Sequence, residues 1–134
     1  MNYWLGKNIL VTGGAGFIGS SLVDSLIEDP HNRITCLDNF DPFYSPKIKR
    51  QNIQVHLKKP NFKLIQVDIR DIHKMKAKLD QHYDTIIHLA AKVGVRPSIQ
   101  DPLSYTEVNV NGTQNILELA RELNHRFGPK KKSS

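Results

Sequence analysis

Asn8-Ile9-Leu10-Val11-Thr12-Gly13-Gly14-Ala15-Gly16-Phe17-Ile18-Gly19 is the stretch of this sequence that decides the fold. Its first five residues form a short apolar run rich in β-branched side chains, which predicts a strand. Glycines then occupy the first, fourth and seventh positions of a seven-residue segment, and from Ile18 onwards apolar residues recur at helical spacing. A strand, a tight glycine-rich turn and a helix in this order are typical of a dinucleotide-binding loop.

Each glycine of this loop has its own expected role. Gly13 permits the sharp exit from the strand, Gly16 lets the backbone approach a pyrophosphate, and Gly19 lets the helix lie close to the sheet. The free amides of Phe17 and Ile18 would face the anion, helped by the helix dipole. The alternative is a glycine-rich turn that binds no ligand.

Two aspartates end the next two apolar runs. Asp38 follows Gly19 by nineteen positions and can accept hydrogen bonds from both hydroxyls of an adenosine ribose, while its charge would repel a 2′-phosphate. This favours NAD over NADP. The carboxylate of Asp68 can accept from the adenine amine while Ile69 packs on the ring. The alternatives are a cap or turn role for Asp38 and, for Asp68, a cap of the turn before Asp71.

Four apolar runs alternate with helical patterns along the chain. They span residues 8–12, 33–37, 62–67 and 85–89. The last helical pattern runs from soon after Pro102 to near Phe127. This alternation predicts parallel strands with right-handed crossovers in the order 3-2-1-4. We therefore expect an α/β fold with an incomplete Rossmann-type doubly wound sheet in residues 1–127, followed by a disordered basic tail at 128–134.

Composition narrows the functional classes. The chain has 134 residues and a formal net charge of +6, enough for one domain but not for a cofactor domain joined to a full substrate domain. No apolar run approaches the roughly 20 residues needed to cross a bilayer, so we expect no membrane contact and a cytoplasmic location. A basic face around an anionic dinucleotide is favoured over nucleic-acid binding, because no recognition motif accompanies the charge. The single cysteine, Cys36, is expected to pack inside a strand.

Motifs along nearly the whole chain resemble those of the NAD-dependent nucleotide-sugar epimerases and dehydratases, within the extended short-chain dehydrogenase/reductase family. They are Gly13 to Gly19, Asp38-Asn39, Asp68-Ile69-Arg70-Asp71, His88-Leu89-Ala90-Ala91 and Asn109-Val110-Asn111-Gly112-Thr113. Val93-Gly94-Val95-Arg96-Pro97-Ser98, followed by Asp101-Pro102, is most similar to the UDP-glucuronate 4-epimerase branch.

The resemblance implies bound NAD, with Asn39 as well as Asp38 among the cofactor-binding residues. It also assigns a second set of residues to the ribose and nicotinamide side. These are Leu89, Ala90, Ala91 and Lys92. It also implies that the loop from Gly94 to Ser98 approaches a UDP-sugar, with Arg96 and Ser98 as candidate substrate contacts. A solvated position for Lys92 and a surface ion pair for Arg96 are the alternatives. For His88 a hydrogen-bonded packing role is favoured over that of a catalytic base.

The catalytic residues of the resembled enzymes cannot be placed. In those enzymes the tyrosine of a Tyr-x-x-x-Lys motif removes a sugar hydroxyl proton while hydride passes to NAD. Tyr44, Tyr83 and Tyr105 lack a lysine four positions later, and we name no catalytic residue and no metal ligand. The expected function is the NAD-binding part of an epimerase or dehydratase that is catalytically incomplete by itself. The alternative is a stand-alone dinucleotide-binding or regulatory module acting with a partner.

The expected strand order has a consequence for association. The fourth strand becomes an unpaired edge, and the apolar sheet face beside it loses helical cover. We therefore expect self-association or a complementing partner.

Overall fold

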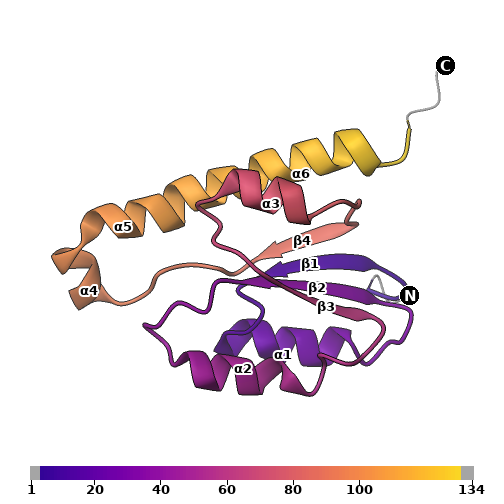
Figure 1. Cartoon of the computed structure of the whole chain (residues 1–134), viewed down its shortest axis with the longest axis horizontal. Coiled ribbons are helices and arrows are strands. Elements are labelled where there is room, and N and C mark those ends of the chain that lie inside the picture. Colours follow the sequence, from indigo (N-terminus) through magenta and orange to yellow (C-terminus); the bar gives the residue numbers. More distant parts are fainter. Residues whose placement is uncertain (1–3, 131–134) are drawn as a thin grey trace.

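The computed structural model describes residues 4–130, and its centre is one four-stranded parallel sheet (Figure 1). The strands are β1 (Asn8–Thr12), β2 (Arg33–Asp38), β3 (Phe62–Gln66) and β4 (Thr85–His88). They lie in the order β3-β2-β1-β4. The incomplete doubly wound Rossmann-type sheet expected from the sequence is therefore confirmed.

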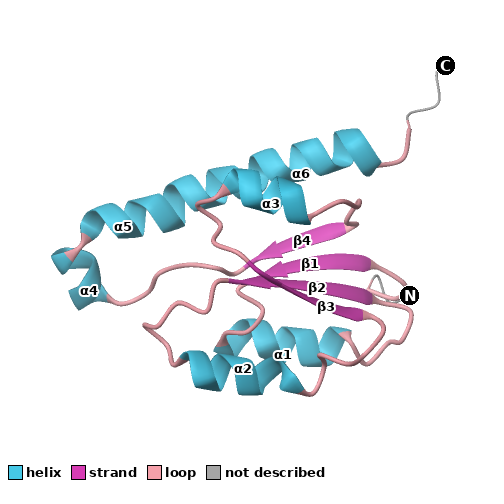
Figure 2. Ribbon diagram, in the orientation of Figure 1, coloured by secondary structure: helices cyan, strands magenta, loops and turns pink. Residues whose placement is uncertain are grey.

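Helices cover both faces of the sheet (Figures 1 and 2). The helices α1 (Phe17–Leu26) and α2 (Pro46–Gln54) lie on one face, and α3 (Ile72–Lys78) and α6 (Thr113–Phe127) lie on the other. The segments α4 (Val95–Gln100), α5 (Pro102–Thr106) and the π-helical η1 (Glu107–Gly112) precede α6, so that α5, η1 and α6 form one long helix. The prediction of a loop at residues 94–98 is wrong for most of that range, because the helix α4 begins at Val95.

Alternation along the strands divides the apolar core into two layers. Ile9 and Val11 of β1 point toward α1, whereas Leu10 points toward α3 and α6. Cys36 is fully buried in β2, as expected, and burial raises the pKa of its thiol to about 12. The hydrophobic contacts of both layers fix the carboxyl ends of the strands relative to the helices that begin there.

The outer edge of β4 differs from the rest of the sheet. Within residues 4–130, β4 pairs with β1 only, and all four of its residues are partly exposed, whereas most of β1 is fully buried. The expected unpaired edge is therefore present.

The two ends of the chain bear on two further expectations. The last helix ends at Phe127, close to the expected position. Most of the expected disordered tail, residues 131–134, lies outside the described part of the chain. None of the helices in residues 4–130 is long and apolar enough to cross a membrane.

Candidate functional site

A groove of about 350 Å³ lies at the carboxyl ends of the strands. Every residue that the sequence assigned to cofactor binding lines it. These are Gly13, Gly16, Phe17, Ile18, Gly19, Asp38, Asn39, Asp68, Ile69, Leu89, Ala90, Ala91 and Lys92. In open parallel sheets the crevice beyond the strand ends, where crossovers leave to opposite faces, is the usual ligand position. Here that crevice lies between β1, whose crossover α1 covers one face, and β4, which leads to helices on the other.

The glycine loop is tightly packed against its surroundings. Gly13 has a φ of +69°, and a Cβ there would lie 2.8 Å from the backbone nitrogen of Ala90. A Cβ on Gly19 would fall on the carbonyl oxygen of Gly13. The first helical hydrogen bond of α1 runs from the Ser20 amide to the Gly16 carbonyl at 2.8 Å. The amides of Phe17 and Ile18 lie in the first turn of α1, where an amide has no partner within the helix, so they are available to an anion.

Asp38 is buried at the end of β2 and ties the glycine loop to the next turn. One carboxylate oxygen accepts from the Phe40 amide at 2.8 Å, and the other accepts from the Ala15 amide at 3.2 Å. The Lys49 ammonium lies 3.7 Å from the first of these oxygens. The turn role weighed as an alternative is therefore present, and the carboxylate also lines the groove. A ribose contact stays a prediction.

Asp68 also combines a local contact with a place in the groove. Its carboxylate accepts from the Arg70 amide at 2.9 Å and from the Arg70 guanidinium at 2.7 Å, and Asn39 donates to it at 3.4 Å. Partial burial by itself would raise the pKa of Asp68. The hydrogen bonds and charge of Arg70 outweigh this effect, so the pKa lies below its ordinary value. Asp68 is thus held as a carboxylate. An adenine contact stays a prediction.

The π-helical segment holds the far wall of the groove. From η1, Asn109 accepts from the Lys92 amide at 2.8 Å and donates to the Lys92 carbonyl at 3.0 Å. The Lys92 ammonium lies 5.7 Å from the centre of the Tyr105 ring. Lys92 is therefore partly buried and clamped at its backbone rather than freely solvated. Single π turns inside α-helices occur often at functional sites.

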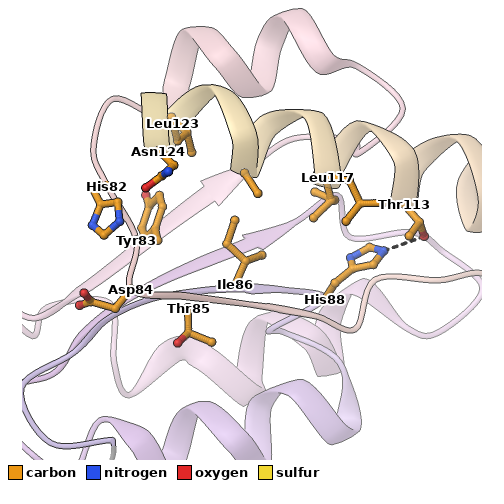
Figure 3. Close-up of a pocket in the computed structure, with 12 residues that line it drawn as sticks. His82, Tyr83, Asp84, Thr85, Ile86, His88, Thr113, Leu117, Leu123 and Asn124 are labelled. Atoms are coloured by element: carbon orange, nitrogen blue, oxygen red, sulfur yellow. Dashed lines mark hydrogen bonds between the residues drawn. The ribbon is translucent and has the colours of Figure 1, made fainter. Parts of the chain in front are cut away.

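His88 joins this wall to the end of β1. Thr12 accepts from the amides of Leu89 and Ala90, so its hydroxyl proton is available for His88 Nδ1. The other ring nitrogen, Nε2, bonds to Thr113 at 3.0 Å (Figure 3). Thr113 donates in turn to the Asn109 carbonyl. The neutral Nε2–H form satisfies both contacts, and burial lowers the pKa of His88. The hydrogen-bonded packing expected of this histidine is present, and the choice against a catalytic base stays a prediction.

A second, apolar groove of about 470 Å³ opens on the other side of His88, between β4 and α6 (Figure 3). Ile86 of β4 and Leu117 and Leu123 of α6 are among its lining residues. Leu117 is 67% exposed. The unpaired edge of β4 thus borders an apolar hollow, but α6 lies beside it, so the expected loss of helical cover is only partial.

Comparison with known proteins gives the chain its family. Residues 10–132 match the family model of GDP-mannose 4,6 dehydratase. The chain belongs to this dehydratase family. It is 36% identical to the UDP-glucuronate 4-epimerase of Thermodesulfobacterium geofontis over 123 residues, which are 91% of this chain and 36% of that protein. It is 40% identical to the dTDP-D-glucose 4,6-dehydratase of Homo sapiens over 118 residues, which are 87% and 33% of the two chains.

Comparison with solved structures also finds nucleotide-sugar epimerases. The UDP-glucuronic acid 4-epimerase of Bacillus cereus, in complex with UDP-glucuronic acid and NAD, superposes with a TM-score of 0.70 and 36% identity. The overlap covers 83% of this chain and 35% of that one. This member of the GDP-mannose 4,6 dehydratase family therefore spans about a third of the length of the relatives that it matches.

The two predicted substrate residues do not line the groove at the strand ends. Arg96 is exposed on α4, and the Ser98 hydroxyl donates to the Val95 carbonyl of its own helix at 2.6 Å. Neither residue lines either of the two grooves. Both substrate contacts stay predictions, and they require α4 to face a ligand beyond the groove.

A Tyr-x-x-x-Lys spacing does occur once, at Tyr3 and Lys7. Tyr3 lies outside the described residues. Lys7 directly precedes β1, and its amide donates to the side chain of Asn32. The groove begins at the opposite end of β1, about 17 Å away for a five-residue strand. Lys7 is therefore not placed to act at the groove.

Some lining residues were not assigned from the sequence. They are Leu37, Asp41, Phe43, Tyr44, Lys49, Val67 and Val93. Lys49 reaches the groove because α2 begins at Pro46, and proline at the first helical position is a usual start signal. That signal could have placed a helix after β2 and Lys49 one turn along it.

Proposed function

We propose that residues 1–127 are the NAD-binding part of a nucleotide-sugar epimerase or dehydratase and are catalytically incomplete by themselves. The carrying observation is the meeting of the free amides at the start of α1 with the buried carboxylate of Asp38 in one groove. A full-length relative with the same fold is known in complex with NAD and UDP-glucuronic acid. The reaction inferred for the full-length members of the family is 4-epimerisation of a UDP-sugar, for which NAD takes up and returns a hydride.

The groove suggests how the dinucleotide would lie. The amides of Phe17 and Ile18 would receive the pyrophosphate, because the positive end of the α1 dipole lies there. Asp38 would accept from the adenosine ribose. The wall from Leu89 to Lys92, held by Asn109, would border the nicotinamide side. The cytoplasmic location expected from the sequence stays a prediction.

Calorimetric titration of NAD into the nucleotide-free chain tests this proposal. We expect binding that the Asp38→Asn variant weakens at least tenfold, because hydrogen bonds to a charged group contribute about 1.5–3 kcal/mol. Asparagine keeps one oxygen acceptor for the local amides and disturbs the fold less than alanine. Asp80→Asn, on an exposed residue outside the groove, is the matched control. Absence of NAD binding to a folded sample, or equal affinities of the two variants, would contradict the proposal.

The apolar groove beside β4 favours a second element of function, namely association. An unpaired parallel strand offers backbone donors and acceptors, and the adjoining hollow offers apolar contact. We propose that this edge is covered by a second copy of the chain or by a complementing partner. The same edge supports the alternative function of a dinucleotide-binding module that acts with a partner.

Sedimentation analysis over a range of concentrations tests the association. We expect reversible self-association that is weakened by Leu117→Glu, which places a charge in the apolar groove on a side chain already 67% exposed. Val55→Glu, at an equally exposed site outside the groove, should leave it unchanged. A monomer at every concentration would contradict self-association, whereas a stoichiometric co-purifying protein would support the partner.

A further inference from the structure

Lys49 and Asp38 form a largely buried ion pair in the wall of the groove. The ammonium nitrogen lies 3.7 Å from a carboxylate oxygen, and the exposed fractions of the two side chains are 12% and 4%. Both residues line the groove. Because the pair is mostly shielded from water, its charges interact more strongly with each other and with a bound anion than charges on an open surface do.

The position of Lys49 is fixed by the way α2 docks. Asn52 donates to the Ala15 carbonyl of the glycine loop at 3.0 Å. The guanidinium of Arg50 lies 4.3 Å from the centre of the buried Phe40 ring, and the Phe40 amide donates to Asp38. Phe40 itself has a φ of +56°, a conformation that non-glycine residues rarely adopt. The first turns of α2 are therefore held against the loop that carries Asp38.

The Lys49 ammonium affects whether the groove can distinguish NAD from NADP. A lone aspartate at the ribose end of the groove would repel a 2′-phosphate and so exclude NADP. Here the adjacent ammonium offsets that charge, and ammonium groups are good partners for phosphate. Asp38 already accepts from two backbone amides, so it does not need all three donors of the ammonium.

We infer that Lys49 is a specificity-determining residue, which lets the groove accept the 2′-phosphate of NADP beside Asp38 and so sets the ratio of NAD to NADP affinity. This inference rests on the proposed dinucleotide function of the groove. It predicts weaker discrimination against NADP than Asp38 alone would impose.

The test measures affinities for NAD, NADP, 5′-ADP and 2′,5′-ADP in the wild type, Lys49→Met and Lys47→Met. Lys47→Met is the matched control, since it removes the same charge from an exposed position on the same helix, outside the groove lining. We expect Lys49→Met to lower the affinity for NADP about tenfold more than that for NAD. The affinity of 2′,5′-ADP relative to 5′-ADP should fall by a similar factor, and Lys47→Met should change neither ratio.

Two further readouts keep the outcomes separate. Circular dichroism checks that Lys49→Met is folded, and Lys49→Arg, which keeps the cation, should preserve both ratios. If the wild type and Lys49→Met had the same ratio of NADP to NAD affinity and the same ratio of 2′,5′-ADP to 5′-ADP affinity, the inference would be overturned. If the wild type binds neither dinucleotide, the proposed function fails, while the two ADP ligands still test Lys49. If none of the four ligands binds, both fail.

Discussion

Gly19→Ala is expected to lower the free energy of unfolding by about 3 kcal/mol or more and to remove nucleotide binding. The new methyl group would fall on the Gly13 carbonyl oxygen and within 2.9 Å of the Gly14 Cα. These are backbone atoms of the turn, so no side chain can move aside. Urea denaturation followed by circular dichroism measures the loss.

Gly16→Ala is the matched control for this substitution. Gly16 has a φ of −72°, and the nearest atom to its added Cβ is the Gly13 carbonyl oxygen at 3.3 Å. Its unfolding free energy should fall by no more than about 1 kcal/mol, while the methyl group hinders the approach of a pyrophosphate. Similar stabilities of the two variants would mean that close contact between α1 and the turn does not restrict residue 19.

Thr12→Val should produce the second-largest effect, a loss of about 2–3 kcal/mol in the free energy of unfolding. Thr12 is fully buried, and its hydroxyl accepts from the amides of Leu89 and Ala90 and bonds to His88. Valine has nearly the same shape but removes the acceptor of the Ala90 amide and the hydroxyl that bonds to His88, whereas the Leu89 amide keeps its bond to the residue-12 carbonyl. Each buried unsatisfied group costs about 1–3 kcal/mol. Because Leu89 and Ala90 line the groove, NAD affinity should fall as well.

Thr12→Ser separates the hydroxyl from the methyl group. Serine keeps the hydrogen bonds and removes one buried methyl, for which we expect a cost of about 1 kcal/mol. Chemical denaturation of both variants gives the comparison. If serine were as destabilising as valine, packing rather than the hydrogen-bond network would account for the stability of this wall.

The strands could be predicted because each is a continuous buried apolar run next to a turn signal. The run at residues 8–12 is β1 itself, and the strand order follows from the alternation of strands with helices. The helix α2 escaped prediction because its nine residues are mostly polar and only Ile53 is buried. The π turn escaped because Val108 and Gly112 lie four positions apart, a spacing that an ordinary helix also satisfies.

Site residues could be predicted where they follow a strand directly. Asp38 and Asp68 lie at strand ends, and parallel strands bring their carboxyl ends to one edge of the sheet. Lys49 could not be placed in this way, since its contact with Asp38 depends on the docking of a later helix. The hydrogen bonds between Asn109 and the backbone of Lys92 likewise could not be predicted, because they join two segments that only folding brings together.

The burial of Cys36 makes the folded chain resistant to alkylation. Its sulfur lies in β2 beneath Gly14, and a Cβ on that glycine would come within 2.6 Å of it. With a pKa of about 12 the thiol holds almost no reactive thiolate at neutral pH. Reaction with iodoacetamide therefore requires the central sheet to open, and this one cysteine reports unfolding without any added label. Any nucleotide that slows the reaction does so by binding the folded chain.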